Sequence, residues 1–218
     1  QNGQQAAIQL NYRGEQLVAQ SLSTPSVDAA NRLRVAELNQ ILGYTFSLSD
    51  QSLAFNSALT SGGTFTHTPI AGVMRIATTT AAGSETIFQT KKYIRFTTGV
   101  SHMINLSAVV GTAKAGVRQR WGLFDLQDGM FFQQTPTALS IVIRSSTSGS
   151  PTDTLVNQTS WNLDKLDGTG PSGATLDLTK NNLYLIDFGG HGSAKVRFGV
   201  MLNGVKTYCH EYIGSNVF

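Results

Sequence analysis

The 218-residue sequence has little of several features that usually define a class of protein. Its only cysteine is Cys209, which excludes an intramolecular disulfide and a cysteine-based zinc site. Charged residues make up 13%, about half the usual share, which argues against acidic disorder and a coiled coil. No apolar run approaches the roughly 18 residues of a membrane helix, so membrane insertion is not expected.

The formal net charge of +3 is small and spread along the chain. Its tight basic clusters are no longer than pairs, such as Lys91 with Lys92 and Arg118 with Arg120. A nucleic-acid surface interleaves basic and aromatic residues over a longer stretch. We therefore expect no nucleic-acid partner.

Strand-forming segments recur at short intervals from residue 85 onward, between Gly-rich turns and with almost no helical pattern. This pattern favours an all-β fold, an antiparallel β-sandwich or jelly-roll-like domain over residues 85–218. Residues 1–84 are predicted as an extended N-terminal arm with short strands that serve for attachment. Within it, residues 6–21 indicate two short strands, and residues 28–42 fit either a short helix or an extended arm.

The last hairpin has the strongest local signal. Asn203-Gly204 between alternating segments predicts a two-residue type I′ turn. The turn pairs Leu202 with Val205, Val200 with Thr207 and Phe198 with Cys209. One face is then expected in the core: Val196, Phe198, Val200, Leu202, Val205 and Cys209. The opposite face is expected to meet solvent or another subunit, and its residues are the candidate interface: Arg197, Met201, Lys206, Tyr208, His210 and Tyr212.

A loop after residue 160 contains two patterns that resemble binding motifs. Residues 168–173 match the spelling G-x-G-x-x-G, but the strand and helix that phosphate binding requires are not indicated around it. Asp164, Asp167 and Asp177 lack the spacing of a calcium loop. We interpret the segment as a Gly-rich turn in a polar loop, with no bound metal or cofactor.

No catalytic arrangement is indicated elsewhere. Asp125 and Asp128 are too close along the chain to face each other across a sugar, so they are interpreted as turn residues. Cys209 and His210 are neighbours on a strand and should point to opposite faces, which excludes a nucleophile–base pair. The four histidines show no ligand spacing. We expect the chain not to be an enzyme.

Large aromatic residues in the strand region have two possible uses. Core packing is the commoner, although aromatic rings on the surface could stack on sugars. The residues concerned are Trp121, Phe124, Phe131, Phe132 and Trp161.

Several blocks resemble a family of tailed-phage virion structural proteins that is common in marine phages. The most specific is Ser160–Gly173, SWNLDKLDGTGPSG. The chain differs from the family pattern at residues 97–103 and 189–192. The other similar blocks are Val27-Asp28 with Asn31–Val35, Lys92–Phe96, Arg120–Asp125, Asp128–Phe132, Leu176–Lys180, Ile186–Phe188, Val196–Gly199 and Tyr208–Glu211.

The resemblance implies a virion component, such as a capsid decoration protein, a head fibre or a tail fibre, that is assembled in the cytoplasm of the bacterial host. Its partners would be other virion proteins and copies of itself, as a homotrimer. The alternative is a fibre head that binds a receptor or glycan on the host surface. The resemblance implies no catalytic residue. Because the chain begins at Gln1 and family members continue past its end, we expect a segment of a longer protein.

Overall fold

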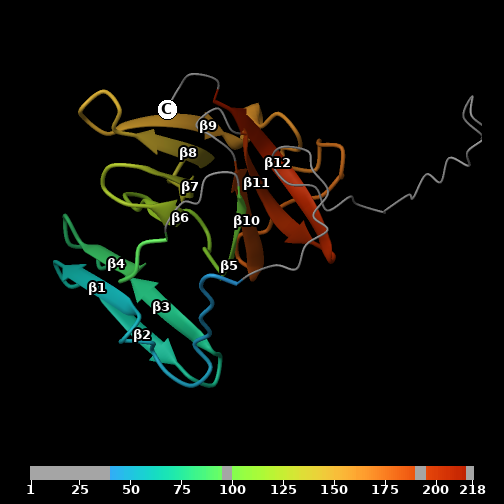
Figure 1. Ribbon diagram of the computed structural model, residues 1–218. Helices are drawn as coiled ribbons and strands as arrows, with labels where there is room; N and C mark the ends of the chain where they lie inside the picture. The colour runs from blue at the N-terminus through green and yellow to red at the C-terminus, as the bar shows by residue number, and fades with distance from the viewer. Residues whose placement is uncertain (1–39, 95–99, 190–194, 215–218) are drawn as a thin grey trace, which may run out of the picture. The chain divides into compact units, whose positions relative to one another are not determined.

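The computed structural model describes residues 40–94, 100–189 and 195–214, which belong to two compact units. One unit spans residues 36–97, and the described residues from 100 onward belong to the other (Figure 1). The described elements are β1 (Phe55–Thr60), β2 (Thr64–Thr68), β3 (Val73–Ala77), β4 (Glu85–Thr90), β5 (Ser101–Ala108), β6 (Gln119–Phe124), β7 (Gly129–Gln134), β8 (Leu139–Ser145), β9 (Thr152–Asn157), the 3-10 helix η1 (Gln158–Ser160), β10 (Asn182–Gly189), β11 (Lys195–Leu202) and β12 (Val205–Ile213).

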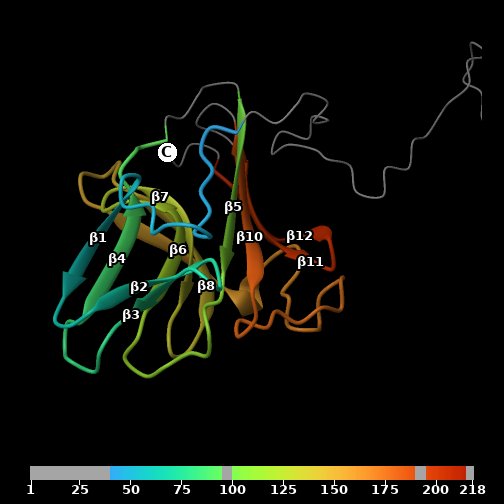
Figure 2. The same ribbon diagram turned by 90° about the horizontal axis from the view of Figure 1, so that it is seen from below.

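The second unit is a β-sandwich of two four-stranded antiparallel sheets. One sheet has the order β12-β11-β10-β5, and the other has the order β6-β7-β8-β9 (Figures 1 and 2). The prediction of an all-β antiparallel sandwich is confirmed. Strands β6 to β9 follow one another as a meander, and the chain then returns to place β10 beside β5. This connectivity differs from the two Greek keys of a jelly roll.

Alternation of apolar residues builds the core between the sheets. In β10, Tyr184, Ile186 and Phe188 face inward, and all three are buried. The ring of Phe132 on β7 lies 5.2 Å from that of Tyr184 and 5.4 Å from that of Phe198 on β11. Each such fully buried side chain contributes about 1.5–3 kcal/mol. Aromatic contacts across the two sheets therefore hold the sandwich together.

The segment after η1 closes one edge of the sandwich. The backbone N–H groups of Leu163 and Asp164 both donate to the carbonyl of Cys209 on β12, at 3.2 and 3.0 Å. Trp161 and Leu166 from the same segment are buried in the core. An uncovered edge strand is a template for pairing with another chain. Here the segment occupies part of the β12 edge.

The β11–β12 hairpin has the predicted turn. Asn203 and Gly204 have φ values of 50° and 78°, as a type I′ turn requires. The predicted pairs Leu202–Val205 and Val200–Thr207 are present.

The predicted pairing of Phe198 with Cys209 is wrong. The register shifts between Phe198 and Gly199, and Phe198 pairs with His210 instead. The irregularity is a β-bulge, in which two residues of one strand oppose one residue of its partner. Every residue after the bulge changes face relative to a regular strand.

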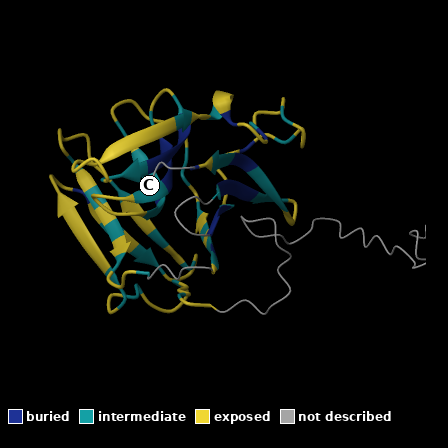
Figure 3. Ribbon diagram, turned by 45° about the horizontal axis from the view of Figure 1, so that its top comes forward, coloured by how far each residue is buried: buried dark blue, intermediate teal, exposed yellow. Residues whose placement is uncertain are grey.

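The unit of residues 36–97 consists of two antiparallel hairpin-like pairs, β1 with β4 and β2 with β3. Its centre is a cluster of rings in which Phe55 and Phe88 stack at 4.7 Å. Phe46 lies 5.4 Å from Phe55, and Phe65 lies 6.1 Å from Phe88. Of residues 40–94, only Gly63 is buried, whereas the sandwich strands contain most buried residues (Figure 3).

The predicted domain boundary between residues 84 and 85 differs from the structure. Strand β4 begins at Glu85 and pairs with β1, so it belongs to the unit of residues 36–97. The long β-favouring run after residue 85 gave no signal that its strand partner lies some thirty residues earlier. The strands predicted at residues 6–21 and most of the helix or arm at residues 28–42 lie outside the described residues.

Candidate functional site

The six candidate interface residues divide between the two faces of the β11–β12 hairpin. Tyr212 packs against the core and His210 is buried, so the prediction that both point outward is wrong. The bulge is the physical reason, because it reverses the alternation after Tyr208. Arg197, Met201, Lys206 and Tyr208 share the opposite face, as their pairings require.

Arg197 and Tyr208 converge on a third residue that sequence reasoning did not single out as a candidate. Asp187 on β10 lies directly opposite Arg197 in the sheet and is fully buried. Its Oδ2 accepts a hydrogen bond from Arg197 Nη2 at 2.7 Å and another from the Tyr208 hydroxyl at 2.9 Å. The Arg197 guanidinium also lies over the Tyr208 ring, 4.4 Å from its centroid. A buried carboxylate needs such compensation for its lost hydration.

Around this cluster the outward face has further charges. Glu211, rather than His210 or Tyr212, pairs with Arg197, and Lys195 Nζ lies 2.8 Å from Glu211 Oε1. Because these charges neutralise one another across neighbouring strands, the face has polar pairs and no concentration of one sign. The bulge, which could not be read from local sequence, decides that Glu211 belongs to this face.

Cys209 and His210 are both buried but are held in structural bonds. The Cys209 thiol donates to the carbonyl of Phe198 at 3.3 Å, and burial raises the pKa of that thiol. His210 Nδ1 accepts from the backbone N–H of Asn162 at 3.3 Å, and burial lowers the pKa of the imidazole. A catalytic cysteine needs a lowered pKa, so this arrangement does not activate the thiol.

The loop with the G-x-G-x-x-G spelling is a turn, as predicted. Asp167 Oδ1 accepts from the backbone N–H of Thr169 at 2.9 Å, and Asp177 Oδ1 from that of Thr179 at 3.0 Å. These bonds are Asx turns, and with the threonine hydroxyls they lower the pKa of both carboxyls. Residues 174–181 contain no helix that could hold a phosphate.

Asp164 organises the same loop from inside. Its two carboxylate oxygens accept from the N–H groups of Leu166 and Ser172, at 2.9 and 2.8 Å. Burial raises the pKa of Asp164, but these hydrogen bonds outweigh it and leave the pKa below its usual value. A Cβ at Gly170 would collide with this carboxylate, so the position requires glycine. Within the described ranges no three His, Cys, Asp or Glu side chains gather as metal ligands.

Asp125 and Asp128 are turn residues, as predicted. Asp125 Oδ1 accepts from the N–H groups of Gln127 and Asp128, which lower its pKa. Asp128 Oδ1 accepts from the N–H of Ser146 at 2.9 Å and so joins two neighbouring turns. Both carboxylates therefore accept hydrogen bonds from backbone N–H groups and stabilise turns.

Most of the large aromatic residues pack in the core. Trp121, Phe132 and Trp161 belong to it, which confirms the commoner interpretation. Phe131 faces away from the core yet is fully buried, with Arg120 and Arg144 at 5.3 and 5.6 Å from its ring centroid. Since two guanidinium groups lie over the Phe131 ring, it does not present an open face for a sugar.

The two arginines near Phe131 are themselves paired. Arg144 binds Asp153 on β9 through two hydrogen bonds, at 2.7 and 2.9 Å, and Arg120 Nη2 lies 3.8 Å from the same carboxylate. The hydrogen bond from Arg144 lowers the pKa of Asp153. The group joins β6, β8 and β9 on the outward face of their sheet.

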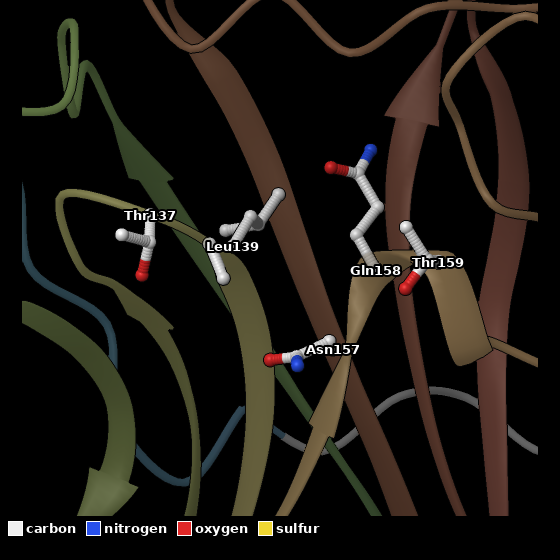
Figure 4. A pocket seen from close by; sticks show the side chains of 6 residues that line it. Thr137, Leu139, Asn157, Gln158 and Thr159 are labelled. Carbon is white, nitrogen blue, oxygen red and sulfur yellow. The ribbon is translucent and has the colours of Figure 1, made fainter.

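A small hollow of about 260 Å³ lies where β9 runs into η1. Figure 4 shows Thr137 and Leu139 on one side and Asn157, Gln158 and Thr159 on the other. Asn157 Oδ1 accepts from Ser140, and Gln158 Nε2 donates to the carbonyls of Lys165 and Leu166. No aromatic residue is among those that line the hollow. Its amides therefore serve the fold, and it lacks the ring on which a sugar would stack.

No protein-family model, curated protein or solved structure matches the chain. In the part of the chain that the structure describes, no helix has the length and apolarity needed to cross a membrane.

Proposed function

We propose that the chain is a structural component of a tailed-bacteriophage particle and acts through assembly contacts. The observation behind this proposal is that the polar side chains at each candidate site bond to the chain itself. Three buried or turn carboxylates accept hydrogen bonds from backbone N–H groups or from a neighbouring side chain: Asp128, Asp164 and Asp187. A scaffold needs such groups for rigidity, whereas an enzyme needs polar groups that converge on a substrate.

The block with the most specific resemblance supports the same proposal. Ser160–Gly173 covers part of the β12 edge, places Trp161 and Leu166 in the core and contains the carboxylate of Asp164. A sequence block whose described contacts are all structural fits a building unit of a particle. The localisation in the virion, the other virion proteins as partners and the homotrimer remain parts of this proposal.

The experiment is proteomic analysis of purified phage particles whose genome encodes the chain. We expect the protein at a copy number that is a fixed multiple of particle symmetry, resistant to high-salt washing. If the protein is abundant in infected cells but absent from purified particles, the proposal is overturned.

The alternative, a fibre head that binds host glycans, gains no support from Phe131 or from the hollow beside Gln158. Phe131 is covered by arginines, and the hollow beside Gln158 has no aromatic wall. The expected result of a glycan array with the full chain is therefore no binding. Specific binding to one glycan class would favour the alternative.

A further inference from the structure

The unit of residues 36–97 leaves much of its apolar surface exposed. Among residues 40–94 no apolar side chain is fully buried. Three leucine and isoleucine side chains are almost entirely exposed: Leu48 and Leu53 at 94%, and Ile70 at 102%. A domain of about 60 residues is marginal even with a normal core, and two-stranded sheets are weak alone. The unit therefore has apolar surface available for a partner.

Strand β1 is the outer strand of this unit. It pairs only with β4 among the described strands, and β4 in turn contacts β2 and β3. Thr86 on β4, for example, donates to the carbonyl of Ala77 at the end of β3, 2.7 Å away. The other long edge of β1 has no strand partner in residues 40–94, 100–189 or 195–214. Its backbone can accept another strand.

Two edges of the sandwich are protected where β1 is not. The β12 edge is partly covered by residues 163–164, and β9 has Asp153, a charge that discourages edge pairing. Strand β1 reads FNSALT, with no charge and no proline, and five of its six residues are exposed. An uncharged and exposed edge is the type that pairs with another strand.

We propose that the β1 edges of two copies of this chain pair antiparallel about a twofold axis. A twofold contact places the same surface patch on both sides, so a charged strand would oppose like charges at close range. β1 has none, and Leu59, 48% exposed, would become buried by the pairing. A second copy is thus the partner that this edge fits without any additional component.

This inference deepens the proposed assembly function and rests on it. It identifies residues 55–60 as one contact by which copies join. The contact links chains in pairs, so the homotrimer implied by the resemblance would require a different surface.

The experiment is sedimentation velocity of the full chain over a wide range of concentration. The wild type is expected to shift from monomer to dimer. Ala58→Lys, at an exposed β1 position, is expected to raise the dimer dissociation constant about tenfold or more, because two lysines would lie close to the axis. Thr154→Lys on β9 is the matched control, with the same charge change on another exposed edge strand, and should leave dimerisation unchanged.

Hydrogen exchange of the wild type provides a readout that needs no variant. Amides of residues 55–60 should gain protection as concentration rises. A chain that stays monomeric, a trimer without that protection, or equal effects of Ala58→Lys and Thr154→Lys would each overturn the inference. Absence of the chain from particles while the dimer forms would instead overturn the proposed function.

Discussion

At the scale of single residues, the most demanding site is the carboxylate of Asp187. It is fully buried on the outward side of the β10–β11 pair, where Arg197 and Tyr208 both donate to one of its oxygens. Removing one partner of a buried ion pair leaves the other charge without compensation, whereas replacing both by apolar residues is often neutral. The residues therefore matter as a group rather than one by one.

We expect Asp187→Ala to lower the free energy of unfolding by about 3–5 kcal/mol, because the Arg197 guanidinium stays buried without its carboxylate. The double variant Asp187→Leu/Arg197→Met should lose much less. Urea unfolding followed by tryptophan fluorescence measures both, since Trp121 and Trp161 lie in the sandwich core. A loss below about 1 kcal/mol for the single variant would contradict this role.

His210 gives the sandwich a dependence on pH. Its pKa is lowered by burial from the ordinary 6.5, so the unfolded chain binds a proton there more readily than the folded chain. The contribution of His210 to the free energy of unfolding should be complete above about pH 6.5. It should be lost as the pH decreases from there through the lowered pKa of the folded state.

His210→Gln should flatten this part of the pH profile, as measured by urea unfolding between neutral and mildly acidic pH. Carboxyls with lowered pKa values, such as Asp153, stabilise the fold above their ordinary 3.8 and lose that contribution only at pH values below it, outside this range. An unchanged slope in His210→Gln would show that the imidazole is not the group responsible.

At the scale of elements, one amide side chain strengthens the backbone contacts between β12 and the segment that follows η1. Asn162 Nδ2 donates to the carbonyl of Glu211, and Asn162 Oδ1 accepts from the N–H of Glu211, both at 2.8 Å. This pair of bonds imitates a strand ladder at the sheet edge. The element is therefore held by side-chain and backbone hydrogen bonds together with the burial of Trp161.

Asn162→Ala is expected to lower the free energy of unfolding by about 0.5–1.5 kcal/mol, because it removes two exposed hydrogen bonds to Glu211 that water can only partly replace. Hydrogen exchange of residues 209–213 should become faster. Asn162→Asp keeps the acceptor and loses the donor, so its effect should be smaller. Equal exchange in Asn162→Ala and the wild type would contradict the edge-closing role.

At the scale of the whole molecule, the two compact units differ in how they are stabilised. The sandwich buries a core of fifteen residues, whereas residues 40–94 contain only one buried residue, a glycine. Stability is not uniform across a structure, and regions with few buried apolar side chains open first. The unit of residues 36–97 should therefore be the less stable part of the monomer.

We expect urea unfolding at low protein concentration to give two transitions that do not coincide. Both tryptophans lie in the sandwich, so fluorescence should report the later transition only. Hydrogen exchange of residues 55–90 should report the earlier one. A single midpoint by both methods would show that the units unfold together.

What the sequence alone determined was local. The alternation in β11, the Asn203-Gly204 turn, the turn roles of Asp125 and Asp128 and the Gly-rich turn at residues 168–173 follow from short-range preferences, and each is present. The class of fold followed from the same signals. These features could be predicted because a residue's own backbone preference and its near neighbours decide them.

Only the tertiary structure decided the remainder. The bulge beside Phe198 set which residues of β12 face the core. Glu211 therefore lies on the outward face, where His210 and Tyr212 had been predicted. The pairing of β4 with β1 moved the boundary between the units, and β10 came to lie beside β5. These outcomes depend on contacts between residues far apart in the chain, whose free energy no local pattern expresses.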